Sequence, residues 1–224
     1  MNLLQINAYK NIHICRWTKQ PPREGGIARD MAYIAFLNTK YYLVRLGRFK
    51  ALNFFKVLIV LLLLRNRKIF IHFPFNGIPL SDKFFVLKLF RLIFLRIIYY
   101  SSQYNELVFD IADLPYEQAI DLDLPIPYYY QEIERKIFNL PAKFIFASYS
   151  MRSYACNKFQ LPIDNTSVCI NGGLVLSKEI LKVNNHLIDK EKVNFVYAGT
   201  LNKGRGIMRV IEVFKNAPDV NLTL

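Results

Sequence analysis

Short apolar runs rich in Val, Ile, Phe and Tyr recur along the chain, and longer segments with helical spacing of apolar residues separate them. Apolar runs of roughly four to eight residues that are rich in β-branched and aromatic side chains are typical of strands. We therefore expect strands at residues 11–17, 40–46, 68–73, 106–109, 143–147 and 167–170.

Helices are expected between these strands. Apolar residues recur at helical spacing from Ile27 to Ala35, after a loop that contains Pro and Gly. Because strands and helices alternate, we expect an α/β fold in which helices cover a Rossmann-like, mostly parallel sheet. The further helices are expected at residues 51–64 (a buried helix), 82–100, 129–138 and 149–158.

The pattern changes after residues 171–173 (NGG), and residues 178–192 are polar and irregular. A strand at 193–198, a loop at 199–206, a helix and a strand from Val220 follow. We therefore expect a domain over residues 1–182, a linker over 183–192 and, over 193–224, the first β-α-β unit of a second, incomplete Rossmann-like domain. In the last helix Ile207, Val210, Ile211 and Phe214 form an apolar face.

Charge narrows the choice of partners. The chain has 30 Lys and Arg against 17 Asp and Glu, for a formal net charge of +13, which calls for an anionic partner: a nucleic acid, an anionic membrane surface or a phosphorylated substrate. Since no RRM, KH or helix-turn-helix signature is present, no nucleic acid is expected. Three widely spaced cysteines without a C-x-x-C pair favour a reducing cytoplasm over a disulfide framework or a zinc site.

The helix expected at 82–100 allows two interpretations. Lys88, Arg91 and Arg96 fall on one broad face, with Leu, Ile and Phe around the rest. Such a helix suits the outside of an α/β domain with its basic side in water, the interpretation that we favour, and it also suits the surface of an anionic membrane. The apolar run 57–64 is far shorter than the ~20 residues that span a bilayer, and no secretory signal is visible at the N-terminus.

The strongest chemical feature is the segment 197–206 (YAGTLNKGRG), between an expected strand and an expected helix. Its glycines permit close approach of the backbone to a ligand, the helix N-terminus favours anions, and the basic side chains add full charges, so the loop suits a diphosphate. A basic turn without a ligand is the alternative. The loop is neither a P-loop nor a G-x-G-x-x-G fingerprint, which disfavours a dehydrogenase. Its candidate ligand-binding residues are Gly199, Thr200, Lys203, Arg205 and Gly206.

These residues resemble the start of the second domain in GT-B glycosyltransferases of the retaining "group 1" kind. Residues 195–201 (FVYAGTL) match the strand that ends in glycine, and Arg205 and Gly206 match the Lys-Gly pair that faces the donor diphosphate. Thr200 stands where the family often has an arginine. Upstream, three segments resemble N-domain segments in family order: the glycine loop 22–29 (PREGGIAR) with Gly25 and Gly26 as candidate binding residues, the stretch 134–154, and the strand end 168–173 (VCINGG).

The resemblance places candidate catalytic carboxylates at Asp110 and Asp113, where the family commonly has a His-Asp pair near the acceptor. A carboxylate at the carboxyl end of a parallel strand suits acceptor binding or base catalysis, while capping a turn is an equal alternative. No histidine stands beside these residues in the sequence. His13 and His72, in expected strands, are interpreted as packed or hydrogen-bonded core residues.

The resemblance implies transfer of a sugar from a nucleotide-diphosphate donor to a carbohydrate or lipid-linked acceptor in surface polysaccharide biosynthesis. Lys203, Arg205 and backbone N–H groups would stabilise the departing diphosphate without a metal or other cofactor. The family's donor-sugar residues lie beyond Leu224, so little activity is expected of this chain alone. The localisation expected is cytoplasmic, with peripheral contact at the inner face of the cell membrane. The alternative function is a non-catalytic basic module that binds an anionic membrane or nucleic acid.

Overall fold

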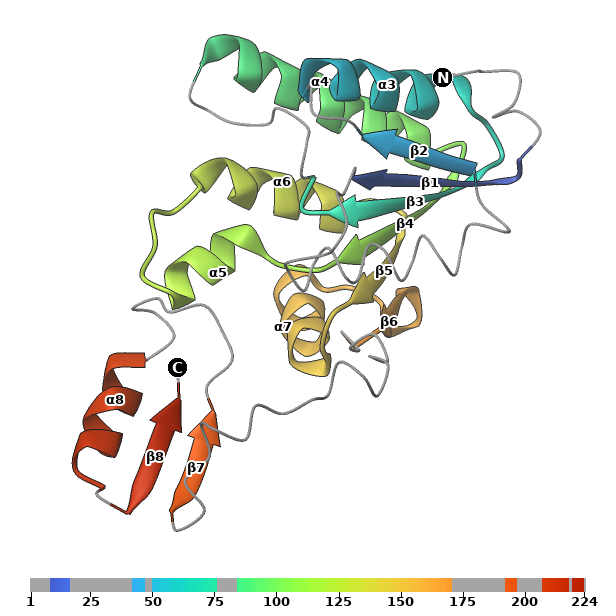
Figure 1. The fold of residues 1–224 in the computed structure, drawn as a ribbon. Helices are drawn as coiled ribbons and strands as arrows, with labels where there is room; N and C mark the ends of the chain where they lie inside the picture. Colours follow the sequence, from blue (N-terminus) through green and yellow to red (C-terminus); the bar gives the residue numbers. More distant parts are fainter. Residues whose placement is uncertain are drawn as a thin grey trace. The chain divides into compact units, whose positions relative to one another are not determined.

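The computed structural model describes residues 9–16, 42–46, 50–75, 84–170, 192–196, 207–217 and 219–223 (Figure 1). The chain divides into two compact units, one of residues 1–115 and 128–174 and the other of residues 116–127 and 175–224. The expected domain boundary near residue 182, the expected linker and the expected helix at 27–35 lie outside the described residues.

The larger unit contains a six-stranded sheet in the order β2-β1-β3-β4-β5-β6. Every neighbouring pair of strands is parallel, which confirms the expected α/β fold with a Rossmann-like sheet. After β2 the chain crosses to the other side of β1 and continues outward, so the strand order reverses between β1 and β3. The strands are β1 (Asn11–Arg16), β2 (Tyr42–Leu46), β3 (Lys68–Phe73), β4 (Glu106–Ile111), β5 (Lys143–Phe146) and β6 (Thr166–Val168).

Alternate residues of the central strands face the main hydrophobic core, because successive side chains in a strand point to opposite faces. Ile69, Ile71 and Phe73 of β3 belong to this core, as do Leu107 and Phe109 of β4. The helices that supply its other side are α3 (Lys50–Leu63), α4 (Phe85–Ser102), α6 (Tyr128–Phe138) and α7 (Tyr149–Phe159). Figure 1 shows α3 and α4 lying side by side.

Local sequence explains where α7 begins and ends. The hydroxyl of Ser148 accepts a hydrogen bond from the backbone N–H of Met151 at 3.1 Å, which satisfies one of the free donors at the helix start. At the other end Gln160 adopts a left-handed conformation with φ 55°, and its N–H bonds the carbonyl of Cys156. A short 3-10 turn, η1 (Ile163–Asn165), then leads into β6.

The second unit contains the β-α-β arrangement that the sequence predicts. Strands β7 (Val193–Val196) and β8 (Val220–Thr223) are parallel, with α8 (Ile207–Lys215) between them in sequence. Phe195 of β7 contacts Phe214 of α8 edge-to-face at 5.1 Å. Helix α5 (Pro115–Asp121), most of which belongs to this unit, was not anticipated.

Two expectations were wrong in detail. The strand that was expected to end at Phe109 continues to Ile111, so Asp110 lies inside β4 rather than after it. The helix expected to be buried, α3, instead exposes one side: Leu52 is 53% exposed and Leu63 60%. Within the described residues no helix is both long enough and apolar enough to cross a membrane.

Candidate functional site

Three buried titratable side chains lie on the face of the sheet opposite the main core: His13 of β1, His72 of β3 and Asp110 of β4. Phe70 and Val108 precede His72 and Asp110 by two residues, so they point to the same face. Together with Ile145 they form a second, much smaller apolar cluster. The polar group therefore lies beside a small apolar cluster, away from the main core.

The register of the sheet brings His72 next to Asp110. These two residues are direct partners across β3 and β4, and each is the last but one residue of its strand. The Nδ1 atom of His72 lies 3.1 Å from the Oδ2 atom of Asp110. The Asp110 side chain is fully buried and the His72 ring retains 7% exposure, so the imidazole is the member of the pair that solvent reaches.

His13 lies on the neighbouring strand at the same face. It is opposite Phe70 in the β1–β3 register, and the two rings meet edge-to-face at 4.9 Å. The pKa of His13 is lowered from 6.5 to about 4, chiefly by burial and also by the nearby His72, while Asp110 opposes the change. His13 is therefore neutral near neutral pH. Within the described part of the chain its Nδ1 atom is buried without a hydrogen-bond partner.

The location of the group is chemically favourable. The reversal of strand order between β1 and β3 is a topological switch point, and in open α/β sheets ligands bind at the carboxyl ends of the strands beside it. His13 and His72 come from the two strands that flank this point. The His72–Asp110 pair therefore lies at the end of the sheet where a ligand is expected.

The pair has the arrangement of an acid–base dyad. An imidazole that donates its Nδ1–H to a carboxylate keeps a lone pair on Nε2, and the carboxylate stabilises the imidazolium that forms when Nε2 takes a proton. Asp110 thus both orients the His72 ring and supports its charged form. His72 and Asp110 can perform proton transfer to or from a substrate hydroxyl.

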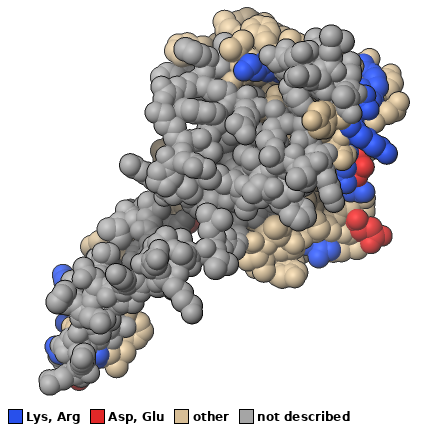
Figure 2. All heavy atoms as spheres, turned by 45° about the vertical axis from the view of Figure 1, so that its right-hand side comes forward, with Lys and Arg blue, Asp and Glu red and all other residues tan. Residues whose placement is uncertain are grey.

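The opposite end of β4 carries a different carboxylate. Glu106 lies 2.9 Å from the Nζ atom of Lys143 and 3.5 Å from that of Lys68, and the Lys143 hydrogen bond is the main cause that lowers the pKa of Glu106. All three side chains are partly exposed. Figure 2 turns the right-hand side of Figure 1 forward and shows basic and acidic side chains together there. This cluster is a solvated ion-pair network.

The candidate residues of the sequence have different outcomes. Asp110 joins the buried group, whereas Asp113 is exposed in the turn between β4 and α5. The other candidates lie outside the described residues: Gly25, Gly26, Gly199, Thr200, Lys203, Arg205 and Gly206.

His72 is the functional candidate that sequence reasoning missed. It is buried and hydrogen-bonded, as expected of a core histidine, but its partner is the carboxylate already singled out at position 110. The spacing in the sequence is consistent with this contact. His72 follows Lys68 by four residues and Asp110 follows Glu106 by four, and in the sheet Lys68 and Glu106 are register partners. Only the register converts this spacing into contact.

A scan against protein-family models finds no match, and a search of the curated proteins finds none either. Among the residues that the structure describes, no group of three or more His, Cys, Asp or Glu side chains is arranged to hold a metal ion.

Proposed function

We propose that this chain acts as a glycosyltransferase that moves a sugar from a nucleotide-diphosphate donor to a hydroxyl of a carbohydrate or lipid-linked acceptor. The resemblance of the sequence to GT-B enzymes supports the proposal. The parallel sheet with its switch point supports it as well, because such sheets bind ligands at the carboxyl ends of their strands. The observation that carries it is the His72–Asp110 pair at this end.

In the proposed reaction His72 is the base. The acceptor hydroxyl gives its proton to Nε2 of His72 while its oxygen forms a bond to the anomeric carbon of the donor sugar. The bond between that carbon and the diphosphate breaks, and the nucleoside diphosphate leaves with the bonding electrons. Asp110, 3.1 Å from Nδ1, stabilises the imidazolium. Lys203 and Arg205 have the charge to balance the leaving diphosphate.

The test is release of a nucleoside diphosphate from a panel of UDP, GDP, dTDP and ADP sugars, with a bacterial lipid extract as acceptor. We expect slow release with one donor class, in keeping with the low activity expected of this chain alone. His72→Gln should lower kcat by about 10²–10⁴-fold, the usual contribution of a positioned acid–base group. Lys158→Gln, on the exposed surface of α7, is the control and should leave kcat unchanged.

Calorimetry distinguishes a chain that binds a nucleoside diphosphate but does not transfer the sugar from a chain that does not bind one at all. UDP and GDP binding is therefore measured on this chain beside the release assay. Binding of a nucleoside diphosphate without its release from a donor places the failure in the transfer step. If the chain neither binds a nucleoside diphosphate nor releases one from any donor, the proposed function is wrong.

A further inference from the structure

The outer sides of α3 and α4 are unusually apolar. On each helix the exposed apolar residues recur every three or four positions, so they form a stripe along one side while the opposite side fills the core. The most exposed of them is Phe85, at 80%. The stripe on α3 consists of Leu52, Phe55, Ile59, Leu62 and Leu63, and the stripe on α4 of Phe85, Val86, Leu89, Leu92 and Tyr99.

The two stripes adjoin because the helices pack against each other. Phe54 of α3 stacks on Phe90 of α4 with ring centroids 4.5 Å apart. Phe55, which belongs to the α3 stripe, meets the same Phe90 edge-to-face at 6.4 Å. The stripes therefore form one surface, called here the α3–α4 face. A contiguous exposed apolar surface of this kind marks an interaction site.

Among the residues that the structure describes, the charges on the α3–α4 face are all positive. Lys88 and Arg96 are exposed on α4 and Lys56 is half-exposed on α3, and neither helix contains an Asp or Glu in its sequence. The third cation of α4 differs from expectation: Arg91 is buried, and its Nη2 atom lies 3.2 Å from Glu132 of α6. Arg91 thus links α4 to α6. The cations that remain on the outer side of α4, Lys88 and Arg96, lie beside its exposed apolar residues.

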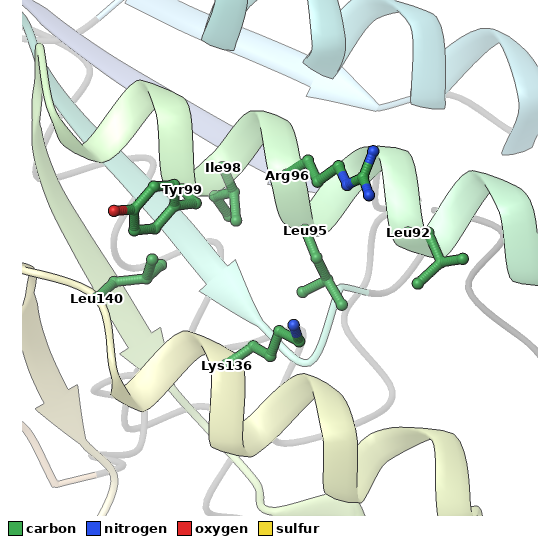
Figure 3. A pocket seen from close by; sticks show the side chains of 7 residues that line it. All are labelled: Leu92, Leu95, Arg96, Ile98, Tyr99, Lys136 and Leu140. Carbon is green, nitrogen blue, oxygen red and sulfur yellow. The ribbon is translucent and has the colours of Figure 1, made fainter.

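A pocket of about 390 Å³ adjoins this face between α4 and α6 (Figure 3). Leu92, Arg96 and Tyr99 line it and are also exposed on the outer side of α4, so the pocket opens at the edge of the α3–α4 face. Lys136 points from α6 toward α4, and the Arg96 side chain extends along α4. No carboxylate is among the residues that line the pocket. They are Leu92, Leu95, Arg96, Ile98, Tyr99, Lys136 and Leu140.

We propose that the α3–α4 face docks on an anionic lipid bilayer and that the phosphate of one lipid headgroup occupies the pocket that Arg96 and Lys136 help to line. The apolar stripes enter the boundary between headgroups and acyl chains, as amphipathic helices do at membrane surfaces. The flanking cations attract anionic lipids. A second copy of the chain fits less well, because two such faces would bring the same cations together without a carboxylate between them.

The first experiment measures sedimentation of the protein with vesicles. Vesicles of phosphatidylcholine alone are compared with vesicles that also contain about one-third phosphatidylglycerol, an anionic lipid. We expect binding to the anionic vesicles, with loss at high salt because surface charges are screened. Binding that is equal for both compositions, or absent for both, would overturn the proposal.

Matched variants then locate the surface. Arg96→Gln with Lys136→Gln should lower the partition coefficient by about 25-fold, at about fivefold for each cation removed near the membrane. Arg135→Gln with Lys158→Gln removes the same charge from exposed positions that do not line the pocket, and its effect should be several-fold smaller. Leu89→Gln on the α3–α4 face should also weaken binding, whereas Ile163→Gln, on exposed η1, should not.

Two further measurements distinguish the other ligands. Inorganic phosphate, matched to sodium chloride in ionic strength, should release no more protein from the vesicles than the salt does; greater release would mean a free phosphate site rather than lipid docking. Sedimentation velocity without vesicles should show no self-association that Leu89→Gln abolishes; such self-association would assign the face to a second copy. None of these readouts depends on sugar transfer, so this inference and the proposed function can fail separately.

Discussion

On one face of the larger unit's sheet, large side chains such as Phe73, Phe109 and Phe146 are fully buried under four helices. On the other face, two histidines and an aspartate lie beside a small apolar cluster of Phe70, Val108 and Ile145. Both faces are buried at these positions. Among the described residues the first face is filled mainly by apolar side chains, although the helices that cover it also bury Asn53, Arg91 and Glu134. Within the described part of the chain, the first face therefore contributes more apolar packing, and the second holds a group of buried titratable side chains that suits chemistry.

The largest effect is expected on the chemical face, in the proposed transfer reaction. Asp110→Asn keeps the shape of the side chain but removes the charge that supports a protonated His72, so kcat should fall by about 10²–10⁴-fold. Glu106→Gln, at the exposed end of the same strand, should leave kcat within about twofold. Steady-state kinetics with the donor found above measures both. Equal losses would mean that the His72–Asp110 pair has no special role.

The next largest effect compares one phenylalanine from each face. Phe109→Ala removes a ring that stacks on Phe144 in the main core and should lower the free energy of unfolding by about 3–5 kcal/mol. Phe70→Ala removes a ring from the small cluster and should cost less, about 2 kcal/mol, because among the described residues this cluster is much smaller than the main core. Urea denaturation provides both values. A larger loss for Phe70→Ala would reverse the assignment of stability to the two faces.

His13 should make stability depend on pH. Its pKa in the folded protein is about 4, below the ordinary 6.5, so the unfolded chain takes up the proton first as the pH falls. His13 therefore contributes to the free energy of unfolding in full above pH 6.5. This contribution, about 3 kcal/mol in total, is lost as the pH drops toward 4. Because His72 and Asp110 lie close by, the pH dependence that His13 contributes is measured as the difference in the free energy of unfolding between the wild type and His13→Gln. A difference that does not change with pH would show that His13 is not held neutral.

The smallest effect is expected in the ion-pair network at the amino end of β4. Glu106→Gln should lower the free energy of unfolding by no more than about 1 kcal/mol near neutral pH, because the pairs with Lys68 and Lys143 are partly exposed. The pKa of Glu106 is lowered in the folded state. Its contribution is therefore present above the ordinary value of 4.5 and disappears as the pH falls below it. Thermal unfolding of the wild type and the variant at two pH values measures this loss of stability. A loss as large as that of Phe70→Ala would contradict the prediction.

Much of the fold could be predicted because the signals were local. Strands such as Lys68–Phe73 are nearly continuous apolar runs, which is how a strand reads when both faces of a parallel sheet are covered. Helix α5 was missed because it is only seven residues long and begins with Pro115, between more obvious elements. Helix α3 was expected to be buried because most of its 14 residues are apolar. Such a pattern does not reveal which apolar side meets a neighbouring element.

The candidate site could be predicted only in part. Asp110 was identified from its place near the end of a strand, but His72 lies 38 residues earlier and its hydrogen bond to Asp110 depends on the pairing of β3 with β4. Arg91 is a similar case: by helical spacing it falls with Lys88 and Arg96, yet it is buried against Glu132 because α6 packs on that side of α4.

The sequence by itself determined the order and type of most elements, because the spacing of apolar residues along a strand or helix is a local property of the chain. The tertiary structure alone decided which face of the sheet holds the large core, that His72 meets Asp110, and that α3 and α4 present adjoining apolar stripes. These depend on strand register and helix packing, which bring together residues far apart in the chain, and no local pattern specifies them.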